Sequence, residues 1–139
     1  MLLPLTPAAS DLKHQLTQQR NWQDTYRQLL LAARQQPPLD PTACNEQHRV
    51  DGCEAKVWLQ VSNANGQLNF TFASESRMVY ALTYAALLPL QGQPPSFATN
   101  FDIQDWLQQC NLSHQLAPSR SNGLYQIIRR AQQLAQAFS

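Results

Sequence analysis

The sequence predicts an α+β fold in which a small antiparallel sheet is packed with helices on one face. Three observations carry this prediction. A hairpin signal lies near the middle of the chain, two segments with helical periodicity precede it, and several more follow it. The 139 residues also fall within the usual size of one domain, so we expect residues 1–139 to form a single domain.

The clearest helix before the hairpin is predicted from about residue 22 to residue 34. Apolar side chains recur there at helical spacing and form one face. They are Trp22, Tyr26, Leu29, Leu30 and Ala33. Pro37 and Pro38 follow and end the helix. A weaker helix over about residues 9–18, with Ser10 as its N-cap, is expected to precede it.

Two stretches of alternating apolar residues predict the hairpin. The first contains Ala55, Val57, Leu59 and Val61, and the second contains Leu68, Phe70 and Phe72. Asn65 and Gly66 between them form the dipeptide that favours a two-residue type I′ turn. Such a turn pairs Val61 with Phe70, which puts both apolar sets on one face of the sheet.

The segment after the hairpin predicts a helix at the centre of the fold, because it is apolar on nearly all sides. Ser74 is its expected N-cap, and its apolar residues include Met78, Val79, Leu82, Ala85 and Ala86. Residues 91–96 are then expected to form a Pro-rich loop.

Two more helices are predicted toward the C-terminus. A short one over residues 103–110 would direct Trp106 and Leu107 inward, and a long one begins at Ser121. The apolar stripe of the long helix consists of Leu124, Ile127, Ile128, Ala131, Leu134, Ala135 and Phe138.

Composition and charge restrict the class of function. Apolar residues make up 43% of the chain and only 14% are charged, with Gln supplying much of the polar surface that Lys and Glu usually supply, which indicates a soluble globular protein. A net charge of +1 provides no field to attract a phosphate backbone, so we do not expect a nucleic-acid partner. The N-terminus lacks the basic region of a signal peptide, and the longest apolar stretch, residues 78–90, is too short to span a membrane. We therefore expect a cytoplasmic protein.

Cys53 is the candidate functional residue. The three cysteines, Cys44, Cys53 and Cys110, have no CxxC spacing and predict neither a disulfide framework nor a zinc site. Cys53 follows Gly52 at the end of the least periodic stretch of the chain, residues 37–52, immediately before the first strand. Long irregular loops in compact domains are often functional, which favours a functional role for Cys53. The alternative is that Cys53 is a small buried hydrophobic residue without a chemical role.

Three basic side chains within five residues of Cys53 favour a reactive thiol. These are His48, Arg49 and Lys56, and Asp51 opposes them. The thiolate is the nucleophilic form of cysteine, and nearby cations raise its fraction.

Four segments together resemble the SufE family of desulfurase activators. They are GCEAKVW (Gly52–Trp58), NWQDTY (Asn21–Tyr26), NFDIQDWL (Asn100–Leu107) and LAPSRSNGL (Leu116–Leu124), and the resemblance covers roughly Asn21 to Phe138. It implies a fold shared with iron–sulfur scaffold proteins of the IscU type. It also implies that Cys53 becomes a persulfide and that Arg120 lies near the transfer site, where a guanidinium favours the thiolate or persulfide anion.

The function that this resemblance implies is sulfur transfer. Cys53 would accept a persulfide sulfur from a cysteine desulfurase of the SufS or CsdA type, stimulate that enzyme, and pass the sulfur to a scaffold for iron–sulfur cluster assembly. The pyridoxal phosphate would lie on the desulfurase, because this chain has only Lys13 and Lys56 and is small for such an enzyme. We expect no cofactor or metal of its own and no enzymatic activity alone, and the sequence leaves monomer and homodimer open.

Two other functions remain open from the sequence. An iron–sulfur scaffold would use Cys44, Cys53 and Cys110 as ligands, with His48, His114 or an Asp as the fourth. A thiol-redox protein would use Cys44 to resolve an oxidised Cys53. Otherwise Cys44 is an exposed loop thiol and Cys110 a packed residue near a helix end.

Overall fold

A computed structural model of the chain describes residues 5–52, 55–112, 114 and 123–138. Within these residues the helices are α1 (Pro7–Thr17), α2 (Trp22–Ala33), α3 (Arg77–Leu87), α4 (Pro95–Asn100), α5 (Ile103–Gln109) and α6 (Leu124–Gln136). The strands are β1 (Val57–Ala64) and β2 (Gln67–Ser74), and the short 3₁₀ helices are η1 (Pro41–Ala43), η2 (Glu46–His48) and η3 (Leu88–Leu90).

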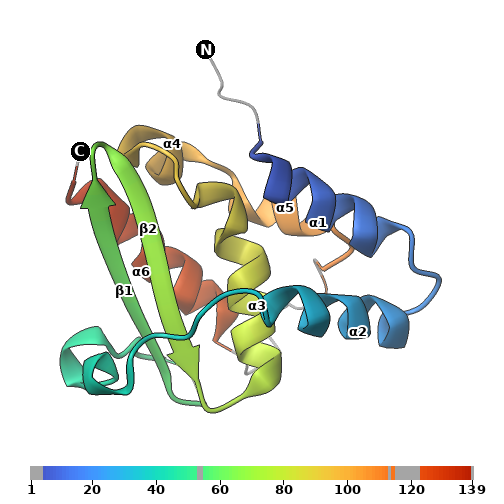
Figure 1. The fold of residues 1–139 in the computed structure, drawn as a ribbon, viewed down its shortest axis with the longest axis horizontal. Helices are drawn as coiled ribbons and strands as arrows, with labels where there is room; N and C mark the ends of the chain where they lie inside the picture. Colours follow the sequence, from blue (N-terminus) through green and yellow to red (C-terminus); the bar gives the residue numbers. More distant parts are fainter. Residues whose placement is uncertain (1–4, 53–54, 113, 115–122, 139) are drawn as a thin grey trace.

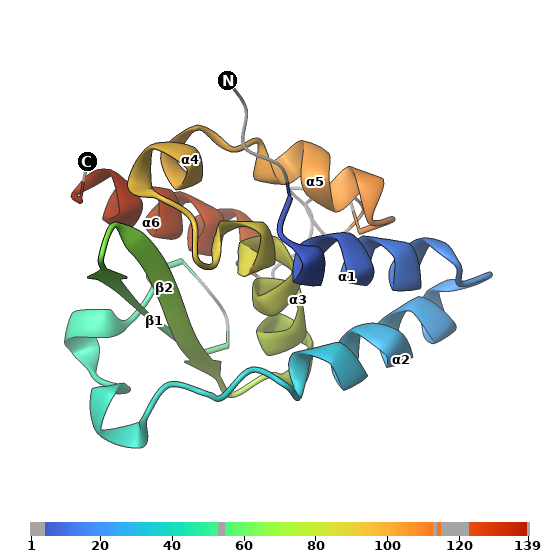
Figure 2. The ribbon, with the colours of Figure 1, turned by 45° about the horizontal axis from the view of Figure 1, so that its top comes forward.

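The helices cover one face of the two-stranded sheet, which confirms the predicted α+β class. Figure 1 shows the hairpin along one side of the molecule with α3 beside it, and α1 and α2 farther from the sheet. In the turned view of Figure 2, α6 lies along the sheet, and α4 lies near the end of the sheet where the turn between β1 and β2 is. The contacts agree, because α3 packs against β2 and α6 against β1.

The hairpin has the predicted register. Val61 pairs with Phe70 and Leu59 pairs with Phe72. Asn65 and Gly66 have φ angles of 56° and 81°, the two positive values that a type I′ turn requires. Leu59, Phe70 and Phe72 are almost fully buried, so the apolar face of the hairpin packs into the hydrophobic core.

Helix α3 lies at the centre of the fold, as its apolar sequence predicts. Every residue from Ala81 to Leu90 is buried. Two buried polar groups near it are satisfied: the Thr83 hydroxyl donates to the carbonyl of Val79 at 2.7 Å, and the Trp106 indole N–H donates to the carbonyl of Ala85 at 2.9 Å.

Both predicted N-caps are wrong by a few residues. Helix α1 begins at Pro7 with Thr6 as its cap, so Ser10 lies inside the helix; helix α3 is capped by Ser76, not Ser74. In each case Ser or Thr residues lie close together, and propensity alone does not choose among them. The Ser74 hydroxyl instead accepts a hydrogen bond from the Ser76 N–H at 3.1 Å.

Two other segments differ from the prediction. The Pro-rich loop predicted over residues 91–96 ends in α4, because Pro94 and Pro95 occupy the cap and first position of a helix, where proline is tolerated. Phe138, predicted on the buried stripe of the last helix, lies beyond α6 and is 43% exposed. Residues 121 and 122, predicted to start that helix, lie outside the described residues.

No helix in the described part of the chain is long and apolar enough to cross a membrane.

Candidate functional site

Both predicted site residues, Cys53 and Arg120, lie outside the residues that the structure describes. The candidate site is therefore built from the residues that flank Cys53 in the chain and from the elements that hold them.

A short antiparallel bridge joins the described backbone on the two sides of Cys53. The N–H of Val50 donates to the carbonyl of Val57 at 2.9 Å, and Arg49 pairs with Trp58. Val50 and Val57 are both buried, so this junction is anchored in the core. Residues 51–56 are thus bounded on both sides by fixed backbone, while Asp51 on the near side is exposed.

Gly52 fits tightly against helix α6. Its φ of +89° is in the left-handed region, which favours glycine. A Cβ atom at this position would lie 2.9 Å from Cγ of Gln126 on α6. The backbone angle therefore favours glycine here, and a larger residue would in addition displace the exposed Gln126 side chain. Cys53 is joined to this residue by a single peptide bond.

The charged side chains near the loop are only partly neutralised. Arg49 lies 3.7 Å from Glu46, and its guanidinium, with those of Arg129 and Arg130, lines a groove of about 410 Å³ between η2 and α6. Asp51 and Glu46 line the same groove, which therefore holds three guanidiniums and two carboxylates.

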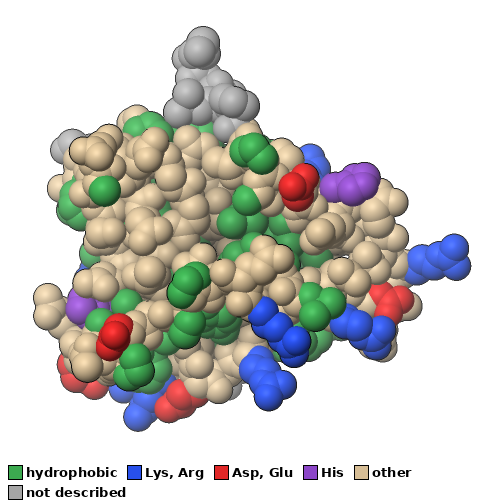
Figure 3. Space-filling view, in the orientation of Figure 1, with side chains coloured by type: hydrophobic (Ala, Val, Ile, Leu, Met, Phe, Trp, Pro, Cys, Tyr) green, Lys and Arg blue, Asp and Glu red, His purple; other side chains and the backbone are tan. Residues whose placement is uncertain are grey.

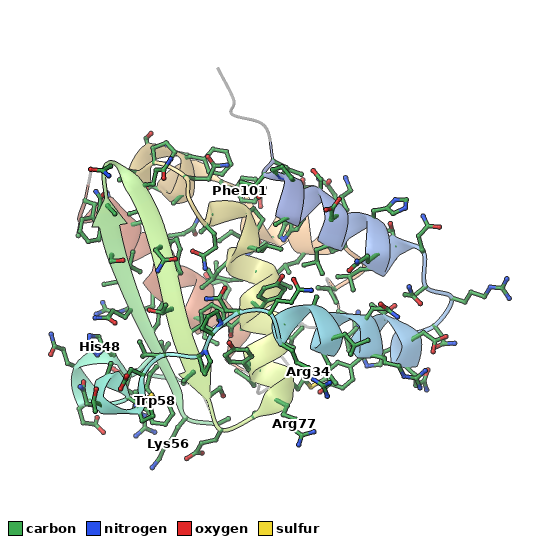
Figure 4. The ribbon with its side chains drawn as sticks, in the orientation of Figure 1. Arg34, His48, Lys56, Trp58, Arg77 and Phe101 are labelled. Atoms are coloured by element: carbon green, nitrogen blue, oxygen red, sulfur yellow. The ribbon has the colours of Figure 1, made fainter. Side chains whose placement is uncertain are left out.

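The other two basic residues predicted near the thiol have different surroundings. The Nδ1 atom of His48 lies 2.8 Å from the carbonyl oxygen of Ala43, so this ring nitrogen donates to the backbone. Lys56 is exposed and forms no ion pair with the residues that the structure describes. Figure 4 shows Lys56 and Trp58 toward the end of the hairpin away from its turn.

The irregular stretch before Cys53 is attached to the sheet and contains two 3₁₀ helices, η1 and η2. The N–H of the buried Leu39 donates to the carbonyl of Phe72 at 2.8 Å. Asp40 caps η1, and its hydrogen bonds to the hydroxyl and N–H of Thr42 lower the pKa of the carboxyl group. Asn45 caps η2.

The two remaining cysteines have contrasting environments. Cys110 is fully buried, and this burial raises the pKa of its thiol to about 12. Cys44 is half-buried, and its thiol lies 3.9 Å from the carbonyl oxygen of Leu39. Among the described residues, no three His, Cys, Asp or Glu side chains come together as a group that could hold a metal ion.

The sequence predicted an irregular segment before Cys53, but it did not predict the tertiary contacts of the residues around it. The pairing of Val50 with Val57 was missed, because a bridge of this length leaves no alternating pattern to recognise. The contact of Gly52 with Gln126 was missed because it joins residues far apart in the chain. One signal was present: a glycine directly before a candidate nucleophile indicates a positive φ or a close approach.

The fold defines a class of small α+β protein in which helices cover one face of a hairpin and a short antiparallel bridge joins the first strand to the preceding segment. A family model described as the SufE Fe–S metabolism associated domain matches residues 10–135. The chain belongs to the SufE family.

A solved structure supports the fold. The chain is similar to a hypothetical protein from Thermus thermophilus, whose solution structure it matches with a TM-score of 0.75. The match covers 96% of this chain and 97% of the other at 18% sequence identity.

Proposed function

We propose that this protein is a sulfur acceptor. Cys53 takes a persulfide sulfur from a cysteine desulfurase, stimulates that enzyme by removing its product, and passes the sulfur on for iron–sulfur cluster assembly. Membership of a family associated with Fe–S metabolism gives the pathway class, and the environment of Gly52 supports the choice of residue.

The observation that carries the proposal is the way Gly52 is held. It follows directly after the bridge between Val50 and Val57, and a Cβ on it would lie 2.9 Å from Cγ of Gln126. Asp51 and Gly52 are both exposed. A nucleophile joined to a fixed and exposed residue is suited to attack on a second protein, because such exchange depends on access as well as on thiolate fraction.

The chemistry is a thiol–persulfide exchange. The Cys53 thiolate attacks the outer sulfur of the donor's persulfide, a new S–S bond forms on Cys53, and the donor cysteine leaves as a thiolate. One S–S bond is made and one is broken, so no external oxidant or reductant is needed. The pyridoxal phosphate that generates the sulfur belongs to the donor enzyme.

The groove beside Gly52 favours this step electrostatically, because its three guanidiniums outnumber its two carboxylates. Arg49, Arg129 and Arg130 line the groove next to Gly52, and cations near a thiol lower its pKa. We assign the same role to Arg120, which precedes α6 in the chain. We place the exchange in the cytoplasm, where thiols are kept reduced.

Stimulation of a desulfurase tests this function. Sulfide release from cysteine, in the presence of a thiol reductant, is measured with the enzyme alone and with increasing amounts of this chain. We expect saturable stimulation that C53A abolishes and that the matched control C44A retains. Full stimulation by C53A would exclude the acceptor role, and loss of stimulation in C44A would instead favour a redox pair.

A further inference from the structure

A hollow of about 400 Å³ lies on the protein surface where α2 ends, β2 ends and α3 begins. Its lining residues are Leu30, Ala33, Arg34, Ser74, Glu75, Arg77, Tyr80 and Ala81. The hollow is distinct from the groove beside Gly52, with which it shares no lining residue.

Two arginines at this hollow have no acidic partner in the described part of the chain. Arg34 and Arg77 are exposed, and neither forms an ion pair with the residues that the structure describes. By contrast, Arg27 on the same helix as Leu30 lies 3.7 Å from Asp24. Figure 4 shows Arg34 and Arg77 close together below α2 and α3, and Figure 3 shows a cluster of blue side chains on this part of the surface.

Arg77 also stands where folding alone does not favour a cation. It is the first residue of α3, and the helix dipole disfavours positive charge at that end. The one carboxylate in the lining, Glu75, offsets only part of the charge of two guanidiniums. The hollow therefore carries a net positive charge that the fold leaves available to a ligand.

The floor of the hollow is apolar. Leu30 contributes aliphatic surface, Ala33 and Ala81 are buried, and the Tyr80 hydroxyl donates a hydrogen bond of 2.7 Å to the carbonyl of Gln36. An apolar floor flanked by guanidiniums fits a protein segment that carries both a large apolar side chain and carboxylates. It fits nucleic acid less well, because the phosphate backbone would use only the charges.

The hollow is linked to the site of sulfur transfer by a short backbone connection. The N–H of Glu75 donates to the carbonyl of Lys56 at 3.1 Å. Lys56 is three positions after Cys53 in the chain. A protein that delivers sulfur to Cys53 would therefore come within reach of the hollow.

We propose that this hollow binds an acidic segment of the sulfur-donating desulfurase, with Arg34 and Arg77 pairing with its carboxylates while an apolar side chain rests on Leu30. This inference rests on the proposed function and names the second contact between the two proteins. The hollow holds the donor, and Cys53 performs the exchange.

Charge reversal separates these two roles. We expect R34E/R77E to raise the concentration of this chain that gives half-maximal stimulation by at least roughly tenfold, because like charges would now face each other. The maximal stimulation should not change. The half-saturating concentration of the unaltered chain should rise with salt, whereas that of the neutral variant R34Q/R77Q should depend on salt much less. R20E is the matched control, since Arg20 is exposed and outside the hollow.

A direct binding measurement tests the docking hollow separately from the proposed function. Binding of the desulfurase to C53S, which cannot accept sulfur, is measured by calorimetry with and without R34E/R77E. If R34E/R77E binds and stimulates as the unaltered chain does while C53A is inactive, the hollow is excluded and the acceptor role stands. If the unaltered chain neither binds nor stimulates, the proposed function fails and this inference falls with it.

Cross-linking identifies the occupant. R34K/R77K keeps both charges and supplies amines that a carbodiimide couples to carboxylates within direct contact. We expect cross-links to an acidic segment of the desulfurase that R20K does not form, located by peptide mass mapping. Cross-links only to scattered positions, equal in R20K, would overturn the assignment of an acidic segment.

Discussion

Among single residues, Gly52 combines two constraints, whereas Gly66 and Gly92 carry only the positive φ. Its φ is +89°, and a Cβ there would lie 2.9 Å from Cγ of Gln126. Gly92 has a similar φ of +75°, yet nothing lies within 4 Å of its hypothetical Cβ. Comparison of the two positions therefore isolates the contact with α6 from the cost of the backbone angle.

We predict that G52A is more destabilising than G92A. Both variants place alanine at positive φ, which costs roughly 1–2 kcal/mol. G52A adds a further, smaller cost, because its Cβ would displace the exposed Gln126 side chain. Urea unfolding of each variant gives the two free energies, and G52A/Q126A should recover part of the difference. Equal losses in G52A and G92A would show that the contact with α6 does not constrain this turn.

Cys110 is predicted to make stability depend on pH in the alkaline range. Burial raises the pKa of its thiol to about 12, against an ordinary value of 9.0. The unfolded chain therefore loses this proton first, so the contribution is complete below pH 9.0 and is lost between pH 9.0 and about 12. The expected slope is roughly 1.4 kcal/mol per pH unit.

The unfolding of C110A as a function of pH provides the measurement. Between pH 9 and 11 its free energy of unfolding should fall less steeply than that of the unaltered chain, although tyrosines such as Tyr84, whose pKa is also raised by burial, still contribute to both. Parallel pH profiles would contradict a buried neutral thiol at Cys110.

At the scale of elements, the start of α3 matters because β2 and the arginine-lined hollow meet there. The Ser76 hydroxyl accepts a hydrogen bond from the N–H of Val79 at 3.2 Å and so caps the helix. Ser10, in contrast, lies exposed within α1 and caps nothing.

We predict opposite effects for two serine-to-alanine changes. S76A should lower the free energy of unfolding by about 1 kcal/mol, since it removes an N-cap. S10A should be neutral or raise it by a few tenths of a kcal/mol, because alanine has the higher helix propensity. Thermal or urea unfolding measures both. If S10A lowered the free energy of unfolding more than S76A does, the cap positions seen in the structure would be contradicted.

Elements with a strong repeating pattern could be predicted, and elements defined by a few backbone bonds could not. The hairpin was predicted to the residue because Asn65-Gly66 fixes the turn and the alternation fixes the register. The 3₁₀ helices η1 and η2 and the short α4 lack any apolar period, and α4 begins within a Pro-rich segment. Their positions depend on tertiary contacts such as the bond between Leu39 and Phe72.

For the whole molecule, the sequence predicted the α+β class and the family, because both depend on patterns spread over most of the chain. The sequence did not predict which segments far apart in the chain lie close together in the fold. Gly52 comes near the Gln126 side chain, and Arg34 and Arg77 come to line one hollow, only after α2, α3 and α6 have packed on the hairpin. The candidate nucleophile could thus be predicted from a motif, while its support and the proposed docking hollow required the fold.

The central claim is that Cys53 carries the sulfur. Intact mass measured after incubation with a cysteine desulfurase and cysteine, without reductant, tests it most directly. We predict a gain of one sulfur atom that a thiol reductant removes, that peptide mapping places on Cys53, and that C53A lacks while C44A and C110A keep. An unmodified mass under conditions where the desulfurase is itself persulfurated, or a gain that persists in C53A, would contradict the account.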